Sequence, residues 1–97
     1  EAVQFIIQAD KLLVVVDGGN KVGEFKALAP YLGLGDFIIC HDYIKDQSTF
    51  ENKFKNLIWN WMEVTENDIQ QTCEKCGLEI VYPELNDVVW SCRKKIR

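Results

Sequence analysis

Two polar segments directly follow runs of apolar residues, and they contain the residue types best suited to chemistry. Asp17 comes after the apolar run 12–16, and His41 and Asp42 come after the run 37–40. In open α/β sheets, ligands bind beyond the carboxyl ends of the strands. If the two runs form adjacent strands about 5 Å apart, the three side chains converge on one point. Two carboxylates and an imidazole there predict a site for a divalent cation such as Mg²⁺, Mn²⁺ or a softer ion.

Each of these residues also has an ordinary structural explanation. Aspartate is a good helix cap, so Asp17 or Asp42 can serve only to start the next element, and His41 can be a hydrogen-bonded structural histidine. Lys21 stands at the expected start of the helix after Asp17, where the helix dipole disfavours a cation. This local conflict indicates a functional role for Lys21, and a solvated surface lysine is an equal alternative.

Three aromatic residues near these segments are candidates for substrate contact. Tyr43 ends the second polar segment, and Trp59 and Trp61 lie in the long segment 44–63, which is polar at first and then aromatic. A connection of this length in a compact domain is usually a functional lid or contains short helices. We predict that Trp59 and Trp61 line a substrate pocket, with packing of the loop as the alternative. Glu63, at the end of the same segment, is a further candidate carboxylate.

The elements that must position these residues follow an α/β pattern. The unbroken and largely β-branched run 12–16 is typical of a strand covered on both faces, and 37–40 is a second such strand. Between them, apolar residues at helical spacing predict a helix over 21–32, which Pro30 is expected to kink or end early. Strand, helix and strand make a βαβ unit with a right-handed crossover. We further predict a helix over 1–9, a helix over 66–76, and an antiparallel hairpin of strands 78–82 and 88–92.

The totals limit the class of protein. The 97 residues allow one domain, 1–97, and 47% hydrophobic with 27% charged residues is ordinary globular composition. The net charge of −4 argues against nucleic acid as a partner, because proteins of that class neutralise phosphates. The basic group 93–97 is predicted to be a solvated tail. No apolar run reaches the roughly 20 residues of a membrane span, and no secretory signal is found, so we expect no membrane partner and a cytoplasmic location.

The four cysteines include one pair with the spacing of metal ligands. Cys73 and Cys76 are separated by two residues, but a zinc site of this type needs a second such pair, which the sequence lacks. On a helix the two cysteines share a face with Ile69. They are therefore predicted to be small buried apolar residues.

Taken together, these segments resemble a known family. The segments Asp17-Gly18-Gly19-Asn20-Lys21, Pro30-Tyr31-Leu32, Gly35-Asp36 and His41-Asp42-Tyr43 are similar to motifs of class I S-adenosylmethionine-dependent methyltransferases, above all of the group with small-molecule O-methyltransferases and cephalosporin hydroxylase-like proteins. In that family an aspartate-glycine motif ends the fourth strand and a carboxylate-bearing pair ends the fifth, and the closing hairpin corresponds to the sixth and seventh. The resemblance implies a Rossmann-like methyltransferase half-domain, the carboxyl-terminal half of the fold, with parallel strands and a C-terminal antiparallel hairpin.

The resemblance also implies roles for single residues. The resemblance to metal-dependent members implies that Asp17 and Asp42 are cation ligands. It also implies that His41 stands at a position where such enzymes often have another ligand. Lys21 lies near the catalytic lysine of catechol-type enzymes, one residue further from the aspartate, and Asn20 stands where relatives often have a histidine. The family's main site for S-adenosylmethionine, a glycine-rich loop after the first strand and an acidic residue after the second, is not found in this sequence. An upstream half that holds the cofactor is therefore expected.

Two functions from different classes follow. In the first, the intact protein transfers a methyl group from S-adenosylmethionine to a hydroxyl of a small molecule or sugar. A bound cation orients the hydroxyl oxygen and lowers the pKa of the hydroxyl. Lys21 or His41 then accepts the proton. The 97-residue chain alone is then expected to be inactive. In the second, the chain is a non-catalytic Rossmann-like module that completes its sheet as a homo-oligomer, since the edge beside 12–16 would otherwise be exposed. A hydroxylase-like relative is a third alternative.

Overall fold

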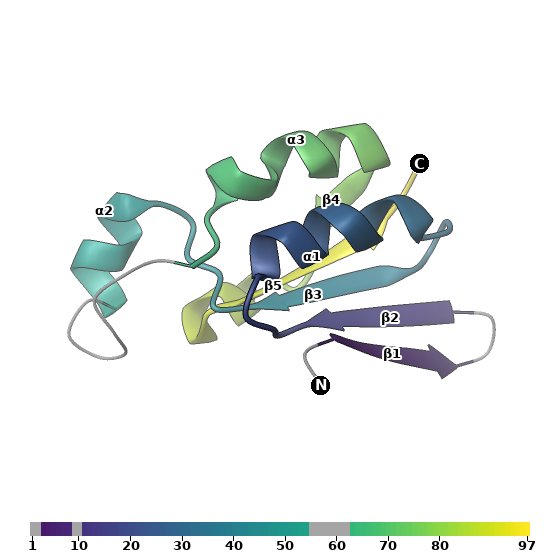
Figure 1. Ribbon diagram of the computed structural model, residues 1–97. Coiled ribbons are helices and arrows are strands. Elements are labelled where there is room, and N and C mark those ends of the chain that lie inside the picture. Colours follow the sequence, from purple (N-terminus) through teal and green to yellow (C-terminus); the bar gives the residue numbers. More distant parts are fainter. Residues whose placement is uncertain (1–2, 9–10, 55–62) are drawn as a thin grey trace.

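The computed structural model describes residues 3–8, 11–54 and 63–97, and within them a mixed β-sheet carries helices on one side (Figure 1). The strands are β1 (Val3–Gln8), β2 (Lys11–Val16), β3 (Phe37–His41), β4 (Leu78–Ile80) and β5 (Trp90–Lys95). They lie in the order β1-β2-β3-β5-β4, in which β2 and β3 are parallel and the other neighbours are antiparallel. The α/β class is confirmed, with one parallel pair in place of a set of parallel strands.

The crossover between the two parallel strands is helical, as predicted. Helix α1 (Lys21–Leu28) continues into a 3₁₀ turn at Ala29–Tyr31. Pro30 explains this early end of the α-helix, because proline has no N–H group and its ring obstructs the preceding turn. The βαβ unit therefore spans β2, α1 and β3, and it places the ends of the two strands at the same edge of the sheet.

The second long helix also lies where the sequence predicts it. Helix α3 (Glu66–Cys76) follows Thr65, whose backbone N–H donates to Asp68 Oδ2 at 2.9 Å, and it ends at Gly77 in a left-handed conformation with φ of 70°. The segment before it contains the short helix α2 (Gln47–Thr49) and a π-helical turn at Phe50–Phe54. Among the described residues, no helix has the length and apolar character that crossing a bilayer requires.

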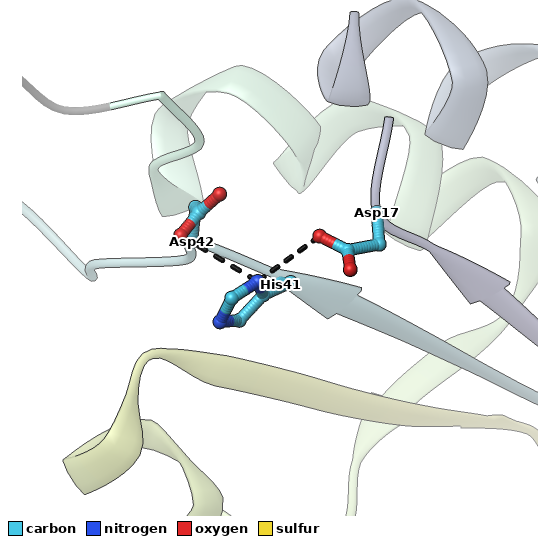
Figure 2. Close-up of side chains that lie close together, drawn as sticks. All are labelled: Asp17, His41 and Asp42. Atoms are coloured by element: carbon cyan, nitrogen blue, oxygen red, sulfur yellow. Dashed lines mark hydrogen bonds and ion pairs between the residues drawn. The ribbon is translucent and has the colours of Figure 1, made fainter. Parts of the chain in front are cut away.

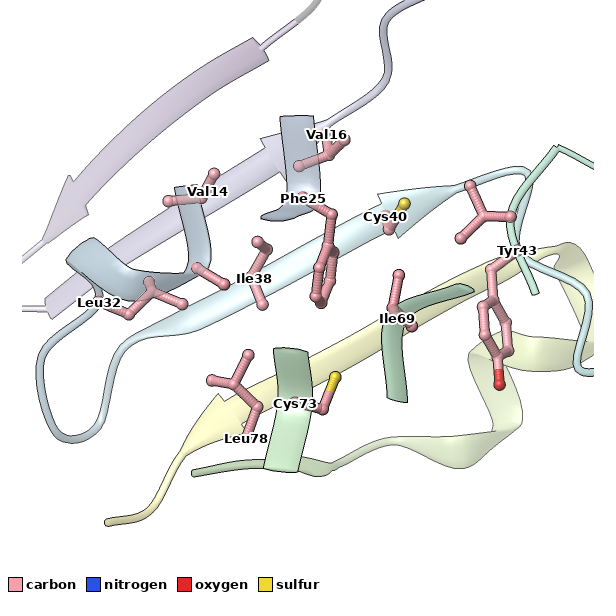
Figure 3. Close-up of a cluster of buried hydrophobic side chains, with 12 residues drawn as sticks. Val14, Val16, Phe25, Leu32, Ile38, Cys40, Tyr43, Ile69, Cys73 and Leu78 are labelled. Carbon is pink, nitrogen blue, oxygen red and sulfur yellow. The ribbon is translucent and has the colours of Figure 1, made fainter. Parts of the chain in front are cut away.

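The main core lies between the sheet and the two long helices (Figure 3). Buried and half-buried side chains alternate along the second half of β2 and along β3, because successive side chains of a strand point to opposite faces of the sheet. The buried ones point towards α1 and α3. Cys73 is part of this core and Cys76 is half-buried, which agrees with the prediction of apolar helix-face cysteines. The buried members are Val14, Val16, Phe25, Ala29, Leu32, Ile38, Cys40, Tyr43, Val64, Ile69, Cys73 and Leu78.

The opposite face of the sheet also presents apolar side chains. Leu13, Val15, Phe37 and Ile39 alternate with the core residues along β2 and β3, and all four are half-buried. Helices α1 and α3 both lie on the other side of the sheet, so neither covers this face (Figure 1).

The predicted helix over 1–9 is wrong. Residues 3–8 form β1, which pairs antiparallel with β2 and sets Val3 opposite Val16 and Gln8 opposite Lys11. A short apolar segment fits both the helical and the strand period, and β-branched and aromatic residues such as Val3 and Phe5 favour a strand. Because β1 occupies the edge beside β2, the exposed edge that was the argument for oligomerisation is absent there.

The closing hairpin is confirmed, but its second strand begins later than predicted. Strands β4 and β5 are antiparallel, with Leu78 opposite Lys95. A 3₁₀ turn at Pro83–Val88 connects them, because the fixed φ of proline suits the start of such a turn, and β5 begins only at Trp90. Strand β5 therefore includes Arg93, which is 3% exposed, and the predicted solvated tail is wrong for this residue.

Candidate functional site

The predicted convergence of Asp17, His41 and Asp42 is confirmed (Figure 2). The parallel pairing of Val16 with Cys40 makes Asp17 and His41 the next residues beyond two adjacent strands. His41 Nδ1 lies 3.0 Å from Asp17 Oδ1 and 3.6 Å from Asp42 Oδ1. One potential ligand atom from each of the three residues lies within 4.8 Å of the others. The strand ends thus bring two carboxylates and an imidazole to one point.

Asp17 is not the cap of α1, which was the structural alternative for this residue. Asn20 is the cap, because its Oδ1 accepts a hydrogen bond from the backbone N–H of Gly23 at 3.2 Å. The Asp17 side chain is 49% exposed and its carboxylate contacts His41, whose side chain is 31% exposed. Both groups can therefore meet a ligand from solvent.

Asp42 is the buried member of the cluster, with 8% of its side chain exposed. Its backbone has φ of 59°, in the left-handed region that aspartate enters more readily than most residues. Its Oδ2 pairs with Lys21 Nζ at 2.9 Å, whereas Oδ1 is buried with no hydrogen-bond partner among the described residues. A buried polar atom without a partner costs about 1–3 kcal/mol, and more when it is charged. Within the described residues, Oδ1 of Asp42 is therefore an acceptor that is free to take a further partner.

Lys21 lies between two carboxylates. Its Nζ is 2.9 Å from Asp42 Oδ2 and 2.9 Å from Glu63 Oε1, and its side chain is 8% exposed. Burial alone would lower the pKa of Lys21, but the hydrogen bonds and charges of Asp42 and Glu63 prevail and raise that pKa well above its ordinary value. In this arrangement Lys21 is an ammonium ion at neutral pH, which favours an electrostatic role over the predicted role as proton acceptor.

The composition of the site fits a divalent cation. Asp17, Asp42 and Glu63 contribute carboxylates, and Lys21 supplies one ammonium in contact with two of them, so negative charge is in excess when His41 is neutral. Carboxylate oxygens suit Mg²⁺ and Mn²⁺, and an imidazole nitrogen extends the range to softer ions. Oδ1 of Asp42, which has no hydrogen-bond partner among the residues that the structure describes, lies at the same point, 3.6 Å from His41 Nδ1. Asp17, Asp42 and His41 are therefore the residues that would hold the ion.

The role in substrate binding predicted for Tyr43 is not supported. Its side chain belongs to the core (Figure 3), and only 2% of the residue is exposed. Its hydroxyl donates to Glu66 Oε1 at 2.8 Å. Glu66 also pairs with the buried Arg93 of β5. Burial and the contact with Glu66 raise the pKa of Tyr43. Tyr43 therefore anchors the chain directly after Asp42 and does not contact solvent. The two tryptophans predicted to line the pocket, Trp59 and Trp61, lie outside the described residues.

Sequence reasoning missed Trp90. This residue is paired with His41 across the antiparallel strands β3 and β5, and the two rings stack with their centroids 4.3 Å apart and their planes at 26°. Stacking of the ring face on Trp90 and the contact of Nδ1 with Asp17 together fix the plane of the imidazole. The register of β5, which the sequence does not reveal, was the missing information.

Comparisons with protein-family models, with curated proteins and with solved structures find no match to this chain. A hollow of about 400 Å³ between the two long helices and the end of β5, lined in part by Lys26, Thr72 and Lys75, contains none of the cluster residues. The cluster of Asp17, His41 and Asp42 is therefore the feature of the described residues that bears on function.

Proposed function

We propose that the chain is the carboxyl-terminal half of a class I S-adenosylmethionine-dependent methyltransferase that acts on a hydroxyl of a small molecule or sugar. The observation that carries the proposal is Oδ1 of Asp42, which has no hydrogen-bond partner in the described part of the chain and lies close to His41 and Asp17 where two parallel strands end. A site beyond the ends of parallel strands is the usual ligand position of open α/β sheets. The order of β2, α1, β3 and a closing antiparallel hairpin supports the proposal, whereas the antiparallel strand β1 beside β2 departs from the parallel strands that the resemblance implies.

In this proposal Asp17, Asp42 and His41 bind a divalent cation, and the substrate hydroxyl approaches from the exposed side of Asp17 and His41. When bound, the cation supplies Lewis-acid chemistry, which lowers the pKa of a hydroxyl. The buried Lys21 adds positive charge at the same edge of the sheet and can stabilise the oxygen anion electrostatically. S-adenosylmethionine itself would be held by an upstream half in a cytoplasmic protein, and the free thiols of the four cysteines agree with a reducing compartment.

The two predicted roles of His41 exclude one another. When Nδ1 donates its hydrogen to Asp17, Nε2 carries the lone pair and can accept a proton from the substrate. When Nδ1 binds a cation, the ring proton is on Nε2, and that nitrogen cannot act as a base. His41 is among the residues that would hold the cation, and the substrate proton would then pass to water at the exposed side of Asp17 and His41.

The test is methyl transfer by the chain joined to its upstream half, with labelled S-adenosylmethionine and a set of hydroxyl acceptors. Chelation by EDTA is expected to abolish turnover and Mn²⁺ or Mg²⁺ to restore it, and Asp42→Asn is expected to lower turnover at least about 100-fold, a common loss when a metal site is disrupted. Asp87→Asn is the matched control, because Asp87 is an exposed aspartate paired with Lys53. Full turnover of Asp42→Asn would remove the cation site, and full turnover in EDTA would show that methyl transfer needs no divalent cation.

The half-buried apolar face of Leu13, Val15, Phe37 and Ile39 favours a second candidate, a non-catalytic module that assembles with another copy of itself. Sheets with parallel strands are usually covered on both faces. Size-exclusion chromatography with light scattering on the 97-residue chain tests this candidate. A dimer that dissociates on Phe37→Glu would support assembly, and a well-folded monomer at high concentration would argue against it.

A further inference from the structure

The two oxygens of Asp42 face different groups, and this division has a consequence for cation binding. Oδ2 contacts the ammonium of Lys21 at 2.9 Å, whereas Oδ1 faces His41 Nδ1 at 3.6 Å and has no hydrogen-bond partner in the part of the chain that the structure describes. A cation held by Oδ1 would therefore share one buried carboxylate with a lysine held by Oδ2. Two positive charges on one carboxylate repel each other, and the repulsion is poorly screened in a buried setting.

Lys21 has a second partner that offsets this repulsion. Glu63 Oε1 lies 2.9 Å from Lys21 Nζ, on the segment just before Val64, which forms a parallel bridge with Tyr43. That bridge fixes Glu63 beside the turn that carries Asp42. Glu63 thus neutralises charge on Lys21 without contacting Asp17 or His41 in the described contacts.

The position of Lys21 in the fold is energetically unfavourable for a positive charge. It is the first residue of α1, where the partial positive charge of the helix end disfavours a cation, and its side chain is almost fully buried. A lysine needed only for solubility would extend into solvent. The ammonium is instead held by Glu63 and by Asp42, and Asp42 also offers an oxygen to the candidate cation site.

We propose that the ammonium of Lys21 competes with a divalent cation for the carboxylate of Asp42 and thereby weakens cation binding at the cluster of Asp17, His41 and Asp42. Glu63 reduces this competition, because its carboxylate neutralises part of the charge of Lys21. The inference rests on the proposed cation site. It makes the site a weak and exchangeable one, in which the ammonium of Lys21 balances Asp42 whenever no divalent ion is bound. It also predicts that substitutions at two neighbouring residues change the affinity in opposite directions.

The experiment is a Mn²⁺ titration of the 97-residue chain, followed by electron paramagnetic resonance of free Mn²⁺. Lys21→Met is expected to bind Mn²⁺ at least about tenfold more tightly than the unmodified chain, because a unit charge a few Å away is worth more than about 1.4 kcal/mol at a partly buried site. Glu63→Gln is expected to bind several-fold more weakly. Lys53→Met is the matched control, since Lys53 forms an exposed pair with Asp87, and its affinity should equal that of the unmodified chain.

The outcomes separate this inference from the proposed function. If Asp42→Asn binds Mn²⁺ as well as the unmodified chain does, the cation site itself is wrong and the inference fails with it. If Asp42→Asn loses binding but Lys21→Met binds no more tightly, the cation site stands and the competition is refuted. Should Lys21→Met not fold, Glu63→Gln decides, because it keeps Lys21 in place; unchanged or tighter binding by that variant overturns the proposal.

Discussion

Replacing Glu66 by glutamine tests the buried network that anchors the chain after Asp42. The Arg93 guanidinium contacts both carboxylate oxygens of Glu66, and its Nε donates to Ser91 Oγ at 3.1 Å. Arg93 is 3% exposed, so the variant leaves a buried charge without its counter-ion. Loss of one partner of a buried pair costs roughly 3–5 kcal/mol. Because the Glu66 side chain is 29% exposed, we expect a smaller loss, about 2–3 kcal/mol.

The assay is reversible urea unfolding of the 97-residue chain, with thermal unfolding beside it. In a domain of this size each kcal/mol lowers Tm by about 4–8 °C, so Glu66→Gln should lower it by roughly 8–24 °C. Glu51→Gln is the matched control, because Glu51 is exposed and contacts only Gln47 among its described side-chain partners. A loss below about 0.5 kcal/mol, within the range of ordinary surface substitutions, would refute the interpretation of Glu66 as the counter-ion of Arg93.

The same pair makes a prediction about pH. Burial alone would raise the pKa of Glu66, but hydrogen bonds from Arg93 and Tyr43 prevail and lower it below its ordinary value of 4.5. The unfolded chain then takes up a proton at Glu66 before the folded chain does, so the stabilisation is present above the ordinary pKa and is lost as pH falls through the lowered one. Glu66→Gln should therefore flatten the fall in stability below pH 4.5, and an unchanged pH dependence would contradict this assignment.

Two further substitutions test how the helices are positioned. Gly77→Ala is expected to cost about 1–2 kcal/mol, because φ is 70° there and a Cβ would also collide with the backbone of Arg97; urea unfolding measures this, and a neutral result would argue against the left-handed end of α3. Asn20→Ala is expected to cost about 0.5–2 kcal/mol through loss of the cap on the Gly23 N–H, and a stabilising effect in the same assay would contradict the cap.

The strand ends could be predicted from the sequence because the signal there is local. Unbroken apolar runs end abruptly at Asp17 and at His41, and the helical pattern between them forces a crossover that returns the second strand beside the first. The convergence of two carboxylates and an imidazole then follows from topology alone. The local signal does not reveal which of these residues is buried and which is exposed, because the burial of Asp42 and the exposure of Asp17 depend on what packs around each strand end.

The sequence-based predictions are wrong where contacts between distant segments determine the conformation or the burial of a residue. Residues 3–8 have a pattern that fits either period, and only the partner strand β2 selects the extended form. Arg93 reads as part of a basic tail, and its burial requires Glu66 and Tyr43 from other elements. Glu63 was a candidate carboxylate from the sequence, but its contact with Lys21 depends on the bridge between Val64 and Tyr43, which no local pattern predicts.

The most direct measurement of the central claim is an anomalous difference map from a crystal of this chain soaked in Mn²⁺. The account predicts a peak at bonding distance, about 2.0–2.6 Å, from Asp17 Oδ1, Asp42 Oδ1 and His41 Nδ1, with Lys21 still on Oδ2 of Asp42. A crystal in which Mn²⁺ binds elsewhere, while His41 keeps its hydrogen bond to Asp17 and Asp42 Oδ1 keeps no ligand, would contradict it.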